Sequence, residues 1–257
     1  MTPLSTYILT KNSEKHLKKI LEPISDVADE ILVVDSGSND KTKEIAESFS
    51  KVKFIFNAFE NFKAQRIFAE NNCKFDLILF LDSDEIPNKT LVESLKRLKE
   101  SDDFTCDAYT ISRKWNVLGK NVHSIYPIVS PDNPIRLYNR KKASFENSQL
   151  VHESITGYET IGHIDGELTH ITFESMAEFR KKLDLYTDIA SKDLIIKGKK
   201  INIFKRILSP IGAFIKWYFL KSGYKDGKIG LYTGQYAYRY TKLKYIKAKH
   251  IKENIRP

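Results

Sequence analysis

The chain has 257 residues and a formal net charge of +9, with 41% hydrophobic and 29% charged residues. This size allows one large α/β domain with an appendage, or two small domains, and the composition excludes wholesale disorder. Two cysteines, Cys73 and Cys106, exclude a disulfide framework and are expected to be reduced thiols.

The N-terminal sequence MTPLSTYILTKN lacks the basic region and long apolar run of a secretory signal. No stretch of 18 apolar residues occurs, so we predict no membrane span and a cytoplasmic protein.

The positive charge is concentrated at the C-terminus. Residues 196–257 contain 16 Lys or Arg against two acids, a net charge of +14, whereas residues 1–195 carry −5. This asymmetry indicates an acidic partner: membrane phosphates, an anionic lipid-linked substrate or nucleic acid.

Strand and helix patterns alternate over the first hundred residues. Apolar runs typical of buried strands alternate with segments of helical periodicity, in the order 4–10, 13–22, 30–35, 41–49, 52–56, 62–72, 77–82 and 89–99. The alternation predicts an α/β fold with a mostly parallel sheet and helices on both faces. Ligands of such sheets bind beyond the carboxyl ends of the strands, so we expect Thr10, Asp35 and Asp82 on one rim.

The pattern changes after residue 103. Short strands are predicted at 106–113, 134–139, 150–155 and 161–172, and residues 114–134, with three prolines, are predicted to form a surface or substrate-covering loop. Helices are predicted at 175–197 and 201–221, whereas the pattern of 228–250 fixes no element. We therefore predict an α/β domain at 1–173, which would carry the site at its rim, and a basic, mostly helical segment at 174–257.

An acidic cluster, Asp82-Ser83-Asp84-Glu85, closes the apolar strand 77–82. Clustered carboxylates repel one another unless a cation offsets their charge. Hard divalent cations bind carboxylate and phosphate oxygens, so the Asp-x-Asp pair predicts a divalent-metal site that also binds a diphosphate. The alternative is that Ser83, Asp84 and Glu85 only cap the next helix.

A second turn, Asp35-Ser36-Gly37-Ser38-Asn39-Asp40, follows strand 30–35. Gly37 permits a sharp turn, and Ser38 or Asp40 can cap the next helix. Asp35 is a candidate contact for a nucleoside, although an ordinary strand–turn–helix connection is the alternative. The absence of G-x-G-x-x-G and Walker A sequences leaves dinucleotide and P-loop sites unsupported.

Further polar residues are candidates for the same site. Lys63, Gln65 and Arg66 lie on or before the third predicted helix, where a cation could reach a diphosphate or simply face solvent. Glu153 could act as a general base, with His152 orienting it or contacting phosphate. If 150–155 is a strand, these two side chains point to opposite faces. Two later histidines are candidate phosphate or metal contacts, or merely structural residues: His163 and His170.

The order of several motifs resembles family 2 glycosyltransferases, and more narrowly the bacterial lipopolysaccharide core β-1,4-glucosyltransferases. The motifs are TKNSEKHL, ADEILVVDSGSNDKT, FKAQRIFA, LILFLDSDE, IRLYNR, LVHESI and KWYFLKSGYKDGKIGL. The resemblance covers about residues 4–235. The motifs LVHES and YFLKSGYKDG narrow it from the broad family to the lipopolysaccharide core enzymes. It implies a GT-A fold, a UDP-sugar donor, Mg²⁺ or Mn²⁺, and inversion at the anomeric carbon.

The resemblance also implies residue roles. Asp35 matches the nucleoside-contacting aspartate, and Asp82 and Asp84 match the Asp-x-Asp metal and diphosphate motif, with Asp84 the more direct ligand. Arg136 matches an Arg-Leu-Tyr segment near donor or acceptor, and Glu153 matches the candidate base. Where relatives carry a Gly- and Trp-rich stretch, this chain reads NVHSIYPIVSPDN, so its acceptor is expected to differ.

The basic C-terminal segment interleaves cationic and apolar residues. Lys205, Arg206, Lys216, Lys221 and Lys225 alternate with isoleucine, leucine and aromatic residues, as in a helix lying on an anionic membrane. The alternative is an apolar face packed on the catalytic domain. Nucleic-acid binding has no supporting motif.

The sequence therefore predicts a cytoplasmic, peripherally membrane-associated glucosyltransferase that acts on a heptose or other sugar of the lipopolysaccharide core. A lipid-linked saccharide is the expected acceptor. Another lipid-linked or capsular glycan as acceptor, a metal-dependent nucleotidyltransferase and a basic RNA-binding protein are the alternatives.

Overall fold

The computed structural model describes residues 2–146, 154–199 and 202–255. The chain divides into a sheet unit, residues 1–113 and 133–170, and a helical unit, residues 114–132 and 171–257. Residues 114–132 thus group with the helices, whereas the sequence analysis placed them in a domain of residues 1–173. The functional division at residue 173 stays a prediction.

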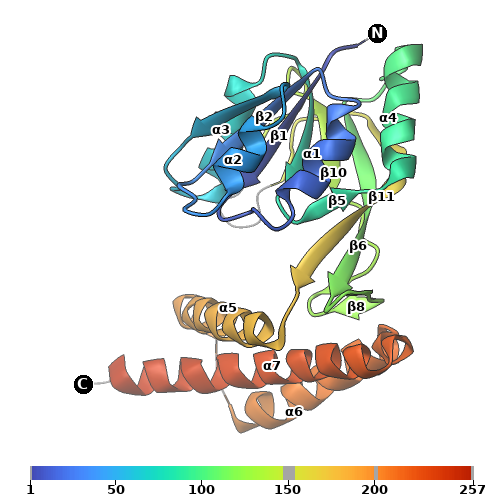
Figure 1. Ribbon diagram of the computed structural model, residues 1–257. Helices are drawn as coiled ribbons and strands as arrows, with labels where there is room; N and C mark the ends of the chain where they lie inside the picture. The colour runs from blue at the N-terminus through green and yellow to red at the C-terminus, as the bar shows by residue number, and fades with distance from the viewer. Residues whose placement is uncertain (1, 147–153, 200–201, 256–257) are drawn as a thin grey trace. The chain divides into compact units, whose positions relative to one another are not determined.

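The sheet unit begins with parallel strands linked by helices (Figure 1). The elements in chain order are β1 (Leu4–Thr10), α1 (Leu17–Ser25), β2 (Glu30–Asp35), α2 (Thr42–Glu47), β3 (Val52–Phe56), α3 (Phe62–Asn72) and β4 (Leu77–Asp82). Strand β1 pairs in parallel with both β2 and β4, and β2 pairs in parallel with β3. The runs of β1, β2 and β4 are mostly buried on both faces, as central parallel strands require, whereas the edge strand β3 is partly exposed.

The sheet continues with antiparallel strands. The elements are β5 (Glu85–Pro87), α4 (Lys89–Ser101), β6 (Ala108–Val117), β10 (Ile135–Asn139) and β11 (Ile161–Phe173). Strand β10 is antiparallel to both β4 and β6, and β11 is antiparallel to β5. The order along the sheet is β3-β2-β1-β4-β10-β6-β11-β5. This order brings the segment after residue 133 directly beside β4, where the acidic cluster lies.

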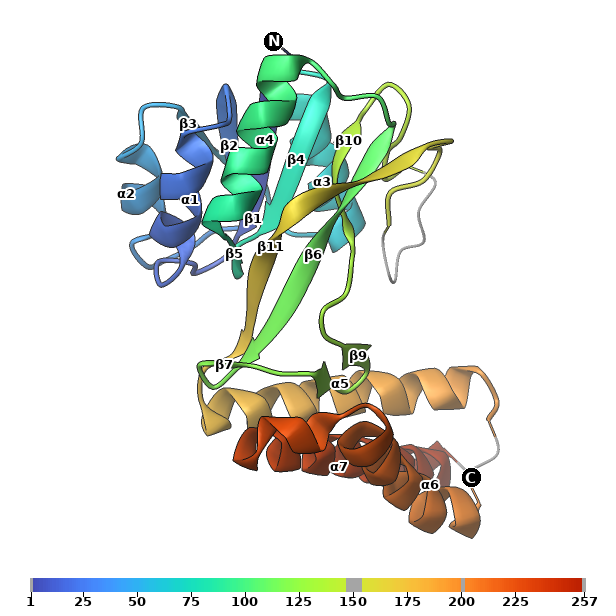
Figure 2. The ribbon, with the colours of Figure 1, turned by 90° about the vertical axis from the view of Figure 1, so that its right-hand side faces the viewer.

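Helices cover both faces of the sheet (Figure 2). Apolar side chains of α1, α2 and α4 pack on one face, against buried residues such as Ile8, Val33 and Leu79. Ala69 and Cys73, from α3 and its end, pack on the other face with Tyr7, Phe80 and Tyr138. The predicted fold class, a mostly parallel α/β sheet with helices on both faces followed by a basic helical segment, is therefore confirmed.

The helical unit is built around the long helix α7 (Lys228–Ile255), against which α5 (Met176–Ile196) and α6 (Ile203–Ile215) both pack. A π-helix, Lys216–Leu220, extends α6, and a short 3-10 helix, Gly223–Asp226, leads into α7. The loop strands are β7 (Lys120–Asn121), β8 (Ser124–Ile125) and β9 (Ile128–Val129). No helix among the described residues is long and apolar enough to cross a membrane.

Candidate active site

The carboxyl ends of β1, β2 and β4 meet on one rim of the sheet unit, as predicted. Thr10 is paired with Asp35 across β1 and β2, and Leu9 is paired with Asp82 across β1 and β4. The Thr10 hydroxyl donates a 3.0 Å hydrogen bond to Asp35 Oδ1. Parallel register alone thus brings together side chains that lie up to 72 positions apart in sequence.

Asp35 organises the turn that follows β2. Its Oδ2 accepts hydrogen bonds from the backbone N–H groups of Gly37 (2.8 Å) and Ser38 (2.7 Å), and its Oδ1 accepts one from the Ser38 hydroxyl (2.5 Å). With the bond from Thr10, four donors fill the acceptor positions of this buried carboxylate. Gly37 has φ +87°, which a turn of this kind requires. The nucleoside contact assigned to Asp35 stays a prediction.

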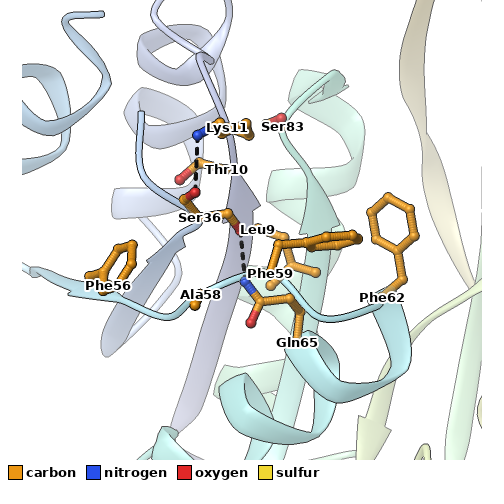
Figure 3. Close-up of a pocket in the computed structure, with 10 residues that line it drawn as sticks. All are labelled: Leu9, Thr10, Lys11, Ser36, Phe56, Ala58, Phe59, Phe62, Gln65 and Ser83. Atoms are coloured by element: carbon orange, nitrogen blue, oxygen red, sulfur yellow. Dashed lines mark hydrogen bonds between the residues drawn. The ribbon is translucent and has the colours of Figure 1, made fainter. Parts of the chain in front are cut away.

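A cavity of about 570 Å³ opens between the ends of β1, β2 and β3 (Figure 3). Three phenylalanines line it and remain unusually exposed: Phe56 by 64%, Phe59 by 51% and Phe62 by 56%. Phe59 and Phe62 meet edge to face, with ring centroids 5.1 Å apart. Exposed aromatic faces around a cavity can stack on a planar ring such as a nucleobase.

Polar groups mark one side of this cavity. Gln65 Nε2 donates to the Ser36 hydroxyl (2.7 Å) and to the Asn57 carbonyl (3.0 Å), and its Oε1 accepts from the Asn57 amide. Lys11 Nζ donates to the backbone carbonyls of Ser36 and Gly37. Gln65 therefore fixes the wall of the cavity, and Lys11 adds a positive charge at its edge (Figure 3).

Asp82 is held by two arginines. Its Oδ1 accepts a 2.9 Å hydrogen bond from Arg66 of α3, and its Oδ2 accepts a 3.3 Å bond from Arg136 of β10. Both guanidinium groups lie about 5 Å from the Phe80 ring centroid, in cation–π contact. Burial alone would raise the pKa of Asp82, but Arg66 and Arg136 outweigh burial and hold the pKa below its usual range.

Glu85 is fully buried at the start of β5 and forms the second half of this network. Arg136 forms a fork-like pair with it, at 2.8 Å from Nε and 2.7 Å from Nη2, and Arg113 of β6 adds a third bond of 2.8 Å. Burial tends to raise the pKa of Glu85, yet the charge of Arg136, with a further contribution from Arg113, lowers it overall. Glu85 is thus a structural ion-pair partner, not the helix cap considered from sequence.

Asp84 faces in a different direction. Its Oδ1 lies 3.2 Å from His170 Nδ1 of β11, and both residues line a cavity of about 330 Å³ together with Asp82, Arg66 and Phe62. Burial tends to lower the pKa of His170, but the hydrogen bond and charge of Asp84 raise it overall. The Asp84 side chain is 34% exposed. Of the acidic cluster, Asp84 is the carboxylate that no arginine engages among the described residues.

The donor atoms at this end of β4 determine whether a divalent cation fits here. A carboxylate beside an imidazole offers one oxygen and one nitrogen ligand, which suits a first-row metal such as Mn²⁺. Both Asp82 oxygens instead accept hydrogen bonds from arginines. No group of three or more His, Cys, Asp or Glu converges as a metal site within the described part of the chain. The donor set therefore fits an ion completed by ligand oxygens, with Asp84 and His170 as the protein contribution.

Other predicted site residues lie elsewhere or outside the described chain. Lys63 donates to the Glu146 carbonyl at 2.6 Å on the surface. His163 contacts the Thr110 hydroxyl through Nδ1 at 3.0 Å. His152 and Glu153, the predicted catalytic pair, lie outside the described residues, so their roles stay predictions.

The sequence analysis missed Arg113 and the three cavity phenylalanines. Arg113 lies in a strand with no local motif, so only the sheet order β6-β11-β5 brings it near Glu85. The phenylalanines had a local signal: Phe56, Phe59 and Phe62 recur every third residue from the end of β3, across the connecting loop, to the start of α3.

Comparison with known proteins decides the family. The family model described as glycosyl transferase family 2 matches residues 5–185, which include the whole rim. The chain belongs to this family. An uncharacterized glycosyltransferase of Rickettsia bellii is 31% identical over 85% of this chain and 76% of its own length. The lipopolysaccharide core biosynthesis glycosyltransferase LpsC of Rhizobium meliloti is 28% identical over 89% of this chain and 85% of its own.

Among solved structures, S. aureus TarS 1-349 in complex with UDP-GlcNAc superposes with a TM-score of 0.49 and 14% identity, over 98% of this chain and 92% of that one. As a member of family 2, the protein is a glycosyltransferase. Family membership favours glycosyl transfer over the nucleotidyl transfer and RNA binding considered from sequence.

The buried ion network gives a test of stability. Glu85→Gln leaves Arg136 and Arg113 facing a neutral amide, so we expect a loss of about 3–5 kcal/mol in the free energy of unfolding. Because the folded-state pKa of Glu85 lies below its usual value of 4.5, the wild-type carboxylate stabilises the fold above that pH and loses this effect as the pH falls through the folded pKa. Urea denaturation from pH 7 to pH 3 measures both effects. An equal free energy of unfolding for the variant and the wild type at pH 7 would contradict the claim that these ion pairs stabilise the fold.

Proposed function

We propose that this family 2 enzyme transfers a sugar, most simply glucose, from a UDP-sugar to a heptose or other sugar of the lipopolysaccharide core, with inversion. The observation that carries the donor assignment is the aromatic cavity on the rim, which lies beside the cavity of Asp84 and His170; Leu9, Phe62 and Ser83 line both. The similarity to LpsC, a lipopolysaccharide core biosynthesis glycosyltransferase, supports a core saccharide as acceptor.

The aromatic cavity suits the nucleoside. Phe56 and Phe59 would stack on the uracil ring, and Thr10 and Lys11 lie at the same wall. The turn organised by Asp35 would support the ribose, with Asp35 acting either through its turn or by exchanging an internal hydrogen bond for a hydroxyl of the ligand. Gln65 keeps the wall beside Ser36 and Asn57 in place.

The second cavity suits the diphosphate and its counter-ion. Asp84 and His170 would hold Mg²⁺ or Mn²⁺, and Arg66 lines the same cavity. The ion would neutralise charge that develops on the departing UDP. Arg66 and Arg136 hold Asp82 in place, and this keeps the end of β4, and therefore Asp84, in one position.

Asp84→Ala tests the metal and donor assignment. We expect loss of transfer, and calorimetry should show that Mn²⁺ no longer increases the affinity for UDP. The matched control is Asp26→Ala, an exposed aspartate beyond α1 that pairs only with Lys96 among the described residues. Wild-type activity and metal-dependent UDP binding in Asp84→Ala would remove the assignment.

Glu153 is the proposed general base that takes the proton from the acceptor hydroxyl, with His152 beside it. Glu153→Gln keeps the size of the side chain but removes its basicity, so the transfer rate should fall by about 10²–10⁴-fold. The UDP affinity, measured by calorimetry, should stay unchanged. A collapse of UDP binding would show that Glu153 supports the donor site and is not simply the base.

The helical unit is proposed to bind the inner face of the cytoplasmic membrane peripherally. Helix α6 exposes an apolar row at helical spacing: Ile203, Ile207, Leu208, Ile211 and Ile215. Phe219 and Leu220 of the following π-helix continue the exposed apolar surface. Lys216, Lys221 and Lys225 are exposed nearby in the chain. Apolar insertion combined with flanking lysines complements an anionic bilayer surface.

Two aspartates introduced on α6 test this surface. The double change Ile207→Asp and Ile211→Asp should weaken binding to vesicles containing phosphatidylglycerol by at least about tenfold, because two exposed apolar side chains that would insert into the bilayer are replaced by anions. Co-sedimentation measures the bound fraction. The control is Leu185→Asp on α5, which is exposed to a similar extent. Equal loss in this control would contradict a specific role for α6.

A further inference from the structure

The helical unit contains a His–Asp pair that no part of the donor site uses. Asp226, in the KDG motif, has a side chain that is only 4% exposed. Its Oδ2 accepts a hydrogen bond from the backbone N–H of His123 at 2.8 Å, and its Oδ1 lies 2.5 Å from His123 Nδ1. The buried carboxylate therefore fixes both the backbone and the ring of His123, and directs Nε2 to the opposite side of a half-exposed ring.

The loop around His123 is held on the helices by further contacts. The Ser124 hydroxyl donates to the Trp217 carbonyl at 3.1 Å. Tyr126 packs edge to face on Trp217, with ring centroids 5.5 Å apart, and also against Tyr240 at 4.9 Å. These contacts hold the loop on the helices, and they therefore fix the position of His123.

A small cavity of about 210 Å³ lies at this loop. It is lined by Lys114, Asn121, Val122, His123, Ser130 and Pro131. The lining combines a cation, an imidazole, an amide and a hydroxyl between two apolar residues. The volume is below that of a typical ligand pocket, so it suits one functional group and not a whole saccharide. Lysine, and histidine in its protonated form, recognise anions.

We propose that this cavity is a subsite for an anionic group, a phosphate or carboxylate, on the acceptor saccharide. His123 and Lys114 contact the anion, and Asp226 is a positioning residue that acts through His123. The inference rests on the proposed glycosyl transfer. It assigns a function to the stretch NVHSIYPIVSPDN, which contains five of the six lining residues. The small cavity has room for a single anionic group. The exposed apolar residues of α6, by contrast, form the surface proposed to contact lipid.

The test uses the full chain with isotope-labelled histidine and NMR detection of the His123 ring, which is assigned by its loss in His123→Asn. Mannose 6-phosphate and glucuronate should shift the His123 signals saturably, and neutral mannose should not. Asp226→Asn and Lys114→Gln should each weaken the phosphate titration by about tenfold. His250→Asn, an exposed histidine of α7, should leave it unchanged.

Several results would overturn the proposal. These are an unshifted His123, an equal response to neutral mannose, or a response only to phosphatidylglycerol vesicles, which would make the cavity a lipid headgroup site. If thermal unfolding shows that Asp226→Asn is not folded, Lys114→Gln decides. In transfer assays both variants should raise the acceptor KM and leave UDP affinity unchanged; a change in UDP affinity alone would also refute the assignment. UDP calorimetry on the same protein tests the proposed function separately.

Discussion

The site depends on one buried network, in which Arg66, Arg113 and Arg136 neutralise Asp82 and Glu85. Burying carboxylates costs several kcal/mol each unless ion pairs and hydrogen bonds compensate. The compensating arginines come from α3, β6 and β10, so the acidic end of β4 can be buried only when all these elements have assembled. The network therefore joins the parallel half of the sheet to its antiparallel half at the point where the proposed chemistry occurs.

This arrangement separates the roles of neighbouring carboxylates. Asp82 and Glu85 have their charge balanced by arginines, whereas Asp84 contacts His170, and both line a cavity. From sequence alone, an acidic cluster predicts a bound cation. In the structure, three arginine side chains already balance the charge of Asp82 and Glu85. The proposed metal then has one carboxylate and one imidazole from the protein, which leaves positions for diphosphate oxygens. Such a site would depend on the donor for part of its affinity for metal.

The rim was predictable because parallel strands place their carboxyl ends together whatever the loops between them do. Helix α3 was predicted at 62–72, and the structure adds the Asn61 cap, whose side chain accepts from the Ala64 N–H. The pairing of β10 with β4 was not predictable, because it depends on contacts distant in sequence. Helix α7 was missed because tyrosines and lysines alternate around it and leave no clean apolar stripe. His170 was only one of two candidate histidines until β11 paired with β5 and set it opposite Glu85.

The exposed apolar face of α6 and the cavity at His123 are joined by direct contacts within the helical unit. The Ser124–Trp217 bond attaches the loop of His123 to the π-helix that continues α6, and Asp226 lies ten residues from that helix's first residue. If α6 lies on the membrane, the loop is carried at a fixed place relative to that surface, where a lipid-linked saccharide would be presented. Changes in the loop sequence could then alter acceptor choice while the rim of the sheet unit keeps the same donor. We therefore propose that the departure at NVHSIYPIVSPDN changes the acceptor and leaves the transfer chemistry the same.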